Sequence, residues 1–289
     1  MTARGWASAG FVLALGSACL AHAKEEPLWE AGLGVGAIHF PQYRGSEQSK
    51  DYVLPAPYFV YRGDFLKADR EGARGVFFRN ENVDINMSLG ASLPVSSSDN
   101  RAREGMSDLK PTVEIGPSFE LTLWRSSRRD AKLDLRMPLR GAISVEARPR
   151  FVGTQFFPHL NVDLRNERYF PGWNLGMLAG GVFTDRRYND YYYRVDPAFA
   201  TPSRPAYDPP GGGYAGTEAI VALSKRFPRY WVGGFVRYDT LNNARFEESP
   251  LVTSKHYFAA GFAIAWILGE SKSRVDVPDL GRRAPSDRD

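Results

Sequence analysis

The sequence predicts an all-β protein, a closed antiparallel transmembrane β-barrel of about twelve strands. Three observations support this fold class. Apolar and polar residues alternate over segments that are too long for ordinary globular strands. Long and short connections between these segments largely alternate, and the chain opens with a segment typical of a secretory signal.

Residues 82–95, NVDINMSLGASLPV, show the alternation most clearly. Every odd position from Val83 to Val95 is apolar, and no even position carries a large apolar side chain. Similar patterns occur in residues 29–37, 112–124, 133–147, 152–164 and 256–268. Period-two alternation indicates extended strands whose two faces meet different environments. Globular strands have about 5 to 6 residues and bilayer-crossing strands about 9 to 11, so the length of these segments favours strands that cross a membrane.

The connections support the same interpretation. We expect strands near residues 28–39, 52–62, 64–69, 73–79, 82–95, 111–125, 131–145, 150–165, 172–185, 214–227, 230–240 and 255–268. The long connections are residues 40–51, 96–110, 186–213 and 241–254, and they fall on one side, as external loops do in outer-membrane barrels. A water-soluble β-sandwich also explains alternation, but it explains the strand length and the polar second face less well. The ordinary composition, 43% hydrophobic, does not argue against a barrel, because a barrel intersperses its apolar residues with polar ones.

The first 23 residues are typical of a secretory signal peptide. Arg4 precedes an apolar run at residues 6–20, and Ala21-His22-Ala23 gives a small-x-small cleavage site, so we expect cleavage after Ala23. Processing as a lipoprotein at Cys19, the only cysteine, is the rival hypothesis. Residues 24–269 would then form the barrel of an exported protein in the outer membrane, in contact with its lipid. Residues 270–289 would form a charged, disordered tail.

Several segments resemble a known family. Pro41, Tyr43, Gly45 and Ser46 match the Pro-x-Tyr-x-Gly-Ser signature of the MipA/OmpV outer-membrane proteins, and residues 51–66, 206–213 and 237–266 are also similar to that family. The resemblance implies a barrel without catalytic activity. It also implies a scaffold that brings a lytic transglycosylase and a peptidoglycan synthase together, although other members are described as porin-like or adhesive. Gly261, Ile264 and Trp266 in the last strand resemble the signal that the barrel-assembly machinery reads, whereas the charged tail departs from the family pattern.

The sequence gives no strong sign of catalysis. Ser254 and His256 stand two residues apart, but such a pair activates a nucleophile only when a third group orients the imidazole. Outside the signal peptide the histidines are scattered and no cysteine is left, which offers no zinc-ligand spacing. The net charge of +4 does not provide the basic stripe of a nucleic-acid-binding protein. We therefore predict no catalytic residue, no cofactor, no metal site and no nucleic-acid partner.

Two features of the predicted barrel leave alternatives open. The inner face carries charges of both signs, which either line a selective aqueous path or close the lumen as paired charges: Glu114, Glu120, Asp134, Arg136, Arg140, Glu146, Asp163, Glu218, Arg237 and Asp239. The longest loop, residues 186–213, is rich in tyrosine, which either contacts a protein partner or folds inward as a plug. Its tyrosines are Tyr188, Tyr191, Tyr192, Tyr193 and Tyr207. The family resemblance implies a scaffold, with a porin-like channel as the alternative and a barrel lipid hydrolase as a distant third.

Overall fold

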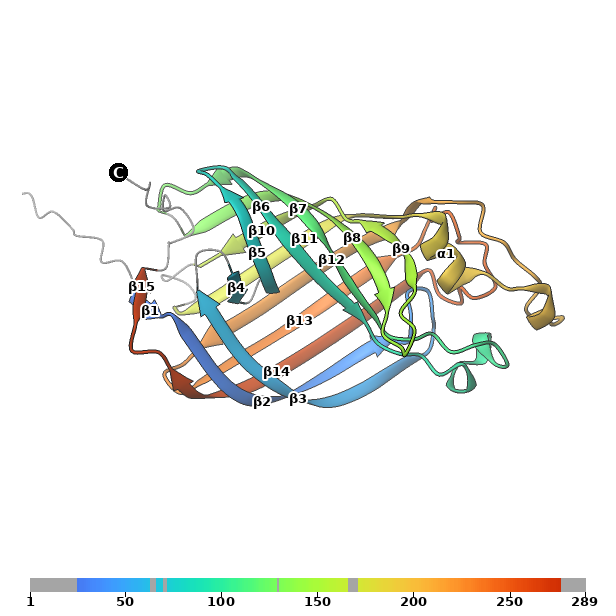
Figure 1. The fold of residues 1–289 in the computed structure, drawn as a ribbon, viewed down its shortest axis with the longest axis horizontal. Helices are drawn as coiled ribbons and strands as arrows, with labels where there is room; N and C mark the ends of the chain where they lie inside the picture. Colours follow the sequence, from blue (N-terminus) through green and yellow to red (C-terminus); the bar gives the residue numbers. More distant parts are fainter. Residues whose placement is uncertain (1–24, 63–65, 70–71, 129, 166–170, 277–289) are drawn as a thin grey trace, which may run out of the picture.

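The protein is mostly β structure, with one α-helix and one large antiparallel sheet (Figure 1). The computed structural model describes residues 25–62, 66–69, 72–128, 130–165 and 171–276. The predicted signal peptide and the end of the predicted tail, residues 277–289, lie outside these residues. Among the residues described, no helix is both long enough and apolar enough to span a membrane.

The large sheet contains thirteen strands. They are β2 (Trp29–Pro41), β3 (Ser49–Arg62), β4 (Leu66–Asp69), β5 (Gly72–Arg79), β6 (Val83–Ser92), β7 (Thr112–Arg125), β8 (Ala131–Ser144), β9 (Phe151–Phe156), β10 (His159–Leu164), β11 (Trp173–Thr184), β12 (Gly213–Arg226), β13 (Tyr230–Thr240) and β14 (His256–Glu270). Consecutive strands pair antiparallel except for β9 and β10, and β14 pairs with β2. Strands β9 and β10 both pair with β8 on one side and with β11 on the other.

The prediction of one strand over residues 150–165 is wrong. Two strands, β9 and β10, share that position, and Phe157 and Pro158 interrupt them. Proline has no N–H to donate to a neighbouring strand, which explains the break. Phe157 turns inward, where its ring stacks on His159 at 4.4 Å. Strand β6 also ends earlier than predicted, at Ser92, and Val95 is buried in the following loop rather than exposed on the sheet.

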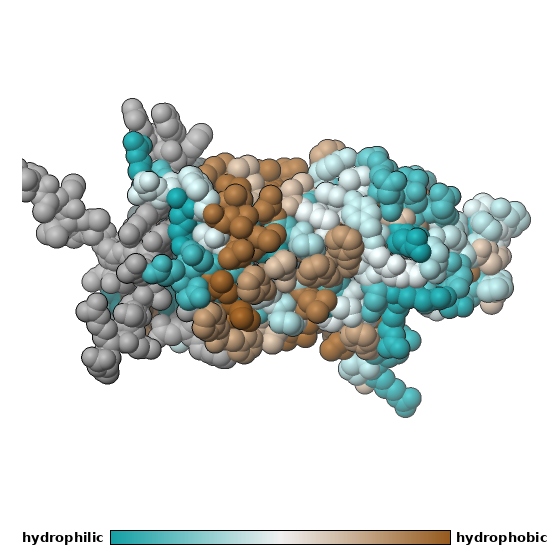
Figure 2. Space-filling view, turned by 90° about the horizontal axis from the view of Figure 1, so that it is seen from above, coloured by the Kyte–Doolittle hydropathy of each residue, from teal (hydrophilic) through white to brown (hydrophobic). Residues whose placement is uncertain are grey.

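Exposure along the strands follows the predicted alternation. On β6, Leu89 is 45% exposed, whereas Asn86 on the opposite face is 2% exposed. The outer face carries exposed apolar side chains around the sheet, among them Leu33, Val53, Ile85, Ile115, Leu139, Leu160, Val221, Val236, Phe262 and Leu268. The enclosed face carries buried polar side chains, among them Glu30, Glu114, Asp134, His159, Asn161, Glu218 and Asp239. Figure 2 shows the resulting apolar band across the strands on one face, with hydrophilic surface toward the loops.

The long connections gather at one end of the sheet, together with helix α1 (Arg186–Tyr193) and the short 3-10 helices η1 (Ser97–Asp99), η2 (Arg101–Arg103) and η3 (Pro197–Phe199) (Figure 1). The buried apolar cluster lies largely under these loops. It includes Tyr43, Val95, Leu109, Tyr193, Leu241, Phe246 and Leu251. The loops therefore form a packed cap with its own hydrophobic core.

The opposite end carries the two ends of the described chain. Strand β1 (Glu25–Pro27) pairs antiparallel with β15 (Arg274–Asp276) (Figure 1). This pairing corrects the expectation that the chain is disordered from residue 270 onward. Glu270 still belongs to β14, and residues 274–276 are held because β1 offers them a strand edge.

Candidate functional site

The enclosed face of the sheet holds a network of paired charges. Arg136 on β8 lies 3.6 Å from Glu120 on β7, 3.5 Å from Asp134 on its own strand and 3.5 Å from Asp163 on β10. Residues on neighbouring strands share a face when they are in register, so alternation brings these four side chains together. One guanidinium thus links three strands from the inside.

A second group of charges lies closer to the loops. Arg237 on β13 pairs with Glu218 on β12 at 2.8 Å and donates to Asp239 at 2.8 Å. Arg44, from the loop after β2, reaches the same Asp239 through Nε at 3.2 Å. Removing one member of a buried pair leaves an uncompensated charge, so such pairs hold one another in place.

Nine of the ten charges predicted for the inner face belong to these groups or extend them. Arg140 lies 3.9 Å from Glu114 and donates through Nε to Ser88 at 2.9 Å. Glu146 is the exception. It lies in the loop after β8, where it pairs with Arg150 at 3.0 Å, because β8 ends at Ser144.

Helix α1 covers the cap end of this interior. Asp185 begins the helix, and its side chain accepts from Tyr188 N at 2.8 Å, which satisfies one of the free amides of the first turn. Tyr193 donates its hydroxyl to Arg44 O at 2.9 Å, and its ring stacks on Phe246 at 3.6 Å. Tyr192 lies 3.4 Å from Ser92 Oγ.

Three tyrosines of the predicted tyrosine loop are therefore buried and face inward. We call Tyr188, Tyr192 and Tyr193 the tyrosine roof. Burial raises the pKa of Tyr188 and of Tyr193 well above the usual value for tyrosine, so both hydroxyls stay neutral. Tyr191 instead accepts from Lys110 N at 2.8 Å, and Tyr207 pairs with Val195 in a short bridge.

The four residues of the family-like signature tie three loops of the cap together. Pro41 ends β2, and Tyr43 donates its hydroxyl to Leu251 O at 2.7 Å. Gly45 has a φ of 94°, a left-handed conformation that favours glycine, and Ser46 Oγ accepts from Asn100 Nδ2 at 3.1 Å. Burial raises the pKa of Tyr43 to about 12. These residues thus have a structural place in the cap.

An interior cavity of about 570 Å³ lies beneath the tyrosine roof. The charged groups Glu114, Glu120, Arg136, Arg140, Glu218 and Arg237 line it together with apolar Ile38, Phe40, Leu178, Ile220 and Phe235. Arg44 also lines it, and the buried Nη2 of Arg44 has no hydrogen-bond partner within the described part of the chain. Volume and mixed lining are those of a site for a small molecule. The sequence does not predict this cavity, because the alternation of apolar and polar residues does not show how much space the inner side chains leave.

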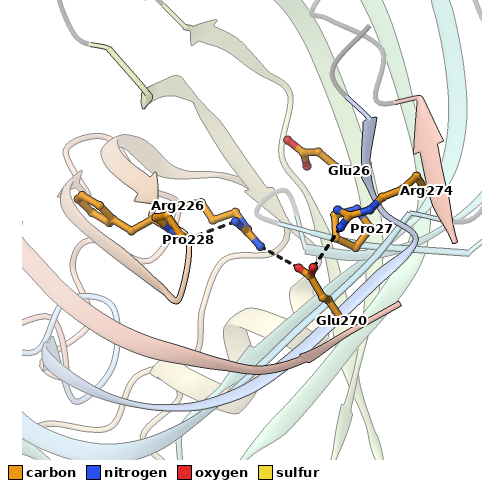
Figure 3. A pocket seen from close by; sticks show the side chains of 7 residues that line it. Glu26, Pro27, Arg226, Pro228, Glu270 and Arg274 are labelled. Carbon is orange, nitrogen blue, oxygen red and sulfur yellow. Dashed lines mark hydrogen bonds and ion pairs between the residues drawn. The ribbon is translucent and has the colours of Figure 1, made fainter. Parts of the chain in front are cut away.

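A second, smaller cavity of about 400 Å³ lies at the opposite end (Figure 3). Glu270 pairs there with Arg226 at 3.3 Å and with Arg274 at 3.2 Å. Arg226 also reaches the buried Glu30 at 2.8 Å. This charged site lies beside the β1–β15 pair, where Glu26, Pro27, Phe227 and Pro228 complete its lining.

The structure does not bring a nucleophile and a base together at Ser254 and His256. Ser254 Oγ donates to His256 O at 2.6 Å, whereas the imidazole Nδ1 lies 2.8 Å from Tyr238 Oη. His159 Nδ1 lies 2.8 Å from Phe157 O. No group of three or more metal-ligating side chains occurs in the described ranges.

The predicted assembly residues lie in β14, which pairs with β13 and β2. Trp266 is exposed on the outer face, and Ile264 shares that face in register with Val232 and Val35. Gly261 faces inward. A Cβ at this position would lie 2.7 Å from the ring of Phe235, so the position has no room for a side chain.

The profile of one protein family matches most of the chain. The profile of the family described as MltA-interacting protein MipA matches residues 33–268. No curated protein matches the chain. Similar solved structures include the P. putida toluene transporter TodX (10% identity, 85% of this chain and 68% of that chain, TM-score 0.27) and the CymD monoaromatic hydrocarbon channel (10%, 84% and 89%, 0.30). A Pseudomonas aeruginosa FadL homologue is a third (8%, 83% and 90%, 0.27). At these TM-scores the structural likeness is too weak to support a functional argument, but the profile match covers most of the sequence, and the chain belongs to the MipA family.

Proposed function

We propose that the chain is an outer-membrane β-barrel, exported with a signal peptide that is cleaved after Ala23. Apolar side chains are exposed in a band and charged side chains are buried, which is the reverse of their distribution in a soluble protein. This distribution fits a sheet whose outer face contacts lipid. The pairing of β9 and β10 with both β8 and β11 supports a ring of strands. A sheet that spans a bilayer must close in this way because unpaired backbone groups are costly in hydrocarbon.

We propose further that this barrel acts as a non-enzymatic scaffold of the MipA type. The observation that carries this proposal is the set of paired charges that link the strands around the interior cavity, together with the tyrosine roof that covers the loop end. Such a barrel is built to hold its shape rather than to pass solutes along its axis. The family name points to a lytic transglycosylase as partner, and the family resemblance adds a peptidoglycan synthase.

We place the end of the sheet that carries β1 and β15 in the periplasm and call it the periplasmic end. It is the expected contact surface for these partners. Both described ends of the chain lie at this end, beside the charged site around Glu270 and Arg274. In the proposed orientation this site faces the compartment where peptidoglycan enzymes work. Crosslinking in intact envelopes followed by affinity purification tests this proposal. Recovery of a lytic transglycosylase with the wild type supports a scaffold, and recovery of no peptidoglycan enzyme contradicts it.

A matched pair of charge reversals localises the contact. Arg274→Glu removes an exposed arginine at the periplasmic end, and Arg150→Glu removes an exposed arginine at the cap end. Each arginine pairs with a glutamate four residues away, so each change replaces one exposed ion pair by two like charges. We expect only Arg274→Glu to reduce recovery of the partner. Equal effects of both changes would contradict the periplasmic contact.

A porin-like channel is the second candidate, and the interior cavity is the observation that favours it. Single-channel recording in planar bilayers distinguishes the two functions. We expect no stable conductance steps from the wild type and clear steps after deletion of residues 188–207, which include the tyrosine roof. Stable steps from the wild type would favour the channel over the scaffold.

A further inference from the structure

The wall of the sheet is incompletely paired between β3 and β6. One edge of β3 pairs with β2 from Ser49 to Tyr61, which is all of the strand except its last residue. The other edge pairs with β4 only at Tyr61 and Arg62. Over Ser49–Val60 this edge has no strand partner among the described residues.

Strand β6 shows the matching gap. It pairs with β7 over its whole length, but its pairing with β5 covers only Asp84–Asn86. Over Met87–Ser92 the second edge of β6 has no strand partner in the described ranges. Six residues at about 3.3 Å each leave about 20 Å of free edge. We call the gap between Ser49–Val60 and Met87–Ser92 the β3–β6 opening.

The sequence explains why the two intervening strands are short. Residues 66–75, LKADREGARG, carry five charges in ten positions and no alternating apolar face. Charged side chains are costly on the lipid side of a barrel, so this segment is unsuited to extend across the apolar band. Strands β4 and β5 accordingly have only four and eight residues.

Loop contacts bridge the outer end of the opening. Asn100, in the loop after β6, donates to Gln42 Oε1 at 2.6 Å and to Ser46 Oγ at 3.1 Å, and both acceptors lie in the loop before β3. Arg101 N donates to Gln48 Oε1 at 2.7 Å. Because β4 and β5 close the other end, the opening is framed on all sides.

The interior cavity extends to this opening. Strands β7, β8, β12 and β13 contribute only alternate, inward-facing residues to its lining. Strand β6 instead contributes consecutive residues from Asn86 to Ser92, so that outward-facing Leu89 and Ala91 also line the cavity. A run of consecutive lining residues places the free backbone edge of β6, and not its inner face alone, on the border of the cavity. Leu54 on β3 agrees, since it shares the inward face with Tyr52 and is still 40% exposed.

We propose that a small, largely apolar molecule with a hydrogen-bond-accepting oxygen enters from the bilayer through the β3–β6 opening and binds in the interior cavity. This inference rests on the proposed membrane location and does not require the scaffold function. The tyrosine roof covers the axial route, whereas the side route meets the apolar phase. Inside, the arginine side chains among the lining residues, Arg44, Arg140 and Arg237, supply N–H donors for such an oxygen. The volume of about 570 Å³ suits a small ligand.

Photolabelling in lipid nanodiscs tests the proposal. The probe is a benzyl alcohol that carries a trifluoromethyl diazirine, and mass spectrometry maps the labelled residues. We expect label on the outer band, at Phe262 or Leu223, and also on interior Phe235 or Leu178. Interior label without the outer band is incompatible with access from lipid. Absence of label from both sites contradicts the proposed membrane location, and label on the band alone overturns only the inference.

A substitution at the opening separates the side route from the axial route. Ala91→Trp places a large ring at the free edge of β6, and Met87→Trp serves as a second variant at the same edge. Ala260→Trp is the matched control, because it changes an outward alanine on β14, which pairs with β13 and β2 at that position. We expect loss of interior label in the β6 variants and no loss in the control, with heat-shifted gel mobility confirming that each variant folds. Interior label that persists in the folded β6 variants overturns the side route, as does equal loss in the control.

The hydroxyl of the probe tests the polar part of the site. The parent phenyl diazirine without the alcohol is expected to label the outer band equally and the interior less. Equal interior labelling by both probes would contradict a role for the arginine donors that line the cavity.

Discussion

Replacing Val221 by arginine tests which face of the sheet meets lipid. Val221 lies on the outer face of β12, is 50% exposed and has paired strands on both sides. Lys225 marks the end of the same face four residues later, about 13 Å away along the strand at about 3.3 Å per residue. At a tilt of about 45° this corresponds to about 9 Å along the membrane normal. In an apolar band about 25 Å tall, Val221 then lies within a few ångströms of the midplane.

The expected cost follows from this depth. An arginine near the midplane of a barrel costs about 2–4 kcal/mol, and one near the interface costs about 0–1 kcal/mol. Lys225→Arg is therefore the matched control, because it keeps a charge at the boundary. Urea titrations of folding into liposomes, followed by heat-shifted gel mobility, measure the free energy of unfolding of both variants. Equal costs for the two substitutions, or no cost for Val221→Arg, would refute the assignment of this face to lipid.

Three further predictions concern the interior and the cap. Arg237→Met leaves Glu218 in a buried site without its arginine, so we expect the free energy of unfolding to fall by about 3–5 kcal/mol in urea titrations, and a second change, Glu218→Gln, to restore part of it. Gly45→Ala and Gly105→Ala each place an alanine in a left-handed conformation, at a cost of about 1–2 kcal/mol. Only the Cβ at residue 45 would also lie 2.8 Å from a leucine methyl. Limited proteolysis of the loops should therefore be faster for Gly45→Ala than for Gly105→Ala. Burial raises the pKa of Tyr43 to about 12, so the neutral hydroxyl stabilises the folded cap. This stabilisation is complete below about pH 10 and is lost as the pH rises toward 12. Phenolate absorbance and proteolysis of the loops should increase together in this pH window.

The sequence predicted the faces of the strands better than their neighbours. Alternation in residues 82–95 assigned Leu89 to the outside and Asn86 to the inside, and the structure agrees. A period of two states which face a side chain occupies, but it contains no information on which strand lies alongside. The alternation of apolar and polar residues therefore does not predict the β3–β6 opening. The charges in residues 66–75 do indicate that this segment is unsuited to cross the apolar band. Pro158 also indicates the break between β9 and β10, since proline lacks the N–H that a central strand needs.

The packing of the tyrosine loop could not be predicted from the sequence, because it depends on contacts between distant segments. Tyr193 stacks on Phe246 and donates to Arg44 O, and neither partner is near it in the chain. Clustered tyrosines suit an exposed contact surface and a buried roof equally well. Only the positions of the other loops determine which of the two forms.

The incomplete wall and the paired contacts of the interior depend on each other. In lipid, apolar side chains gain little from packing against lipid tails, so strand pairing and interior contacts must carry the stability of a barrel. Beside the unpaired edge of β6, Arg140 on β8 donates to Ser88 on β6 from the inside. Asn100 joins the two loops that flank the opening. Ser46 of the family-like signature accepts one of these hydrogen bonds, so the residues that carry the resemblance also hold the frame of the opening. A barrel stabilised in this way can keep a gap toward the membrane without losing its shape.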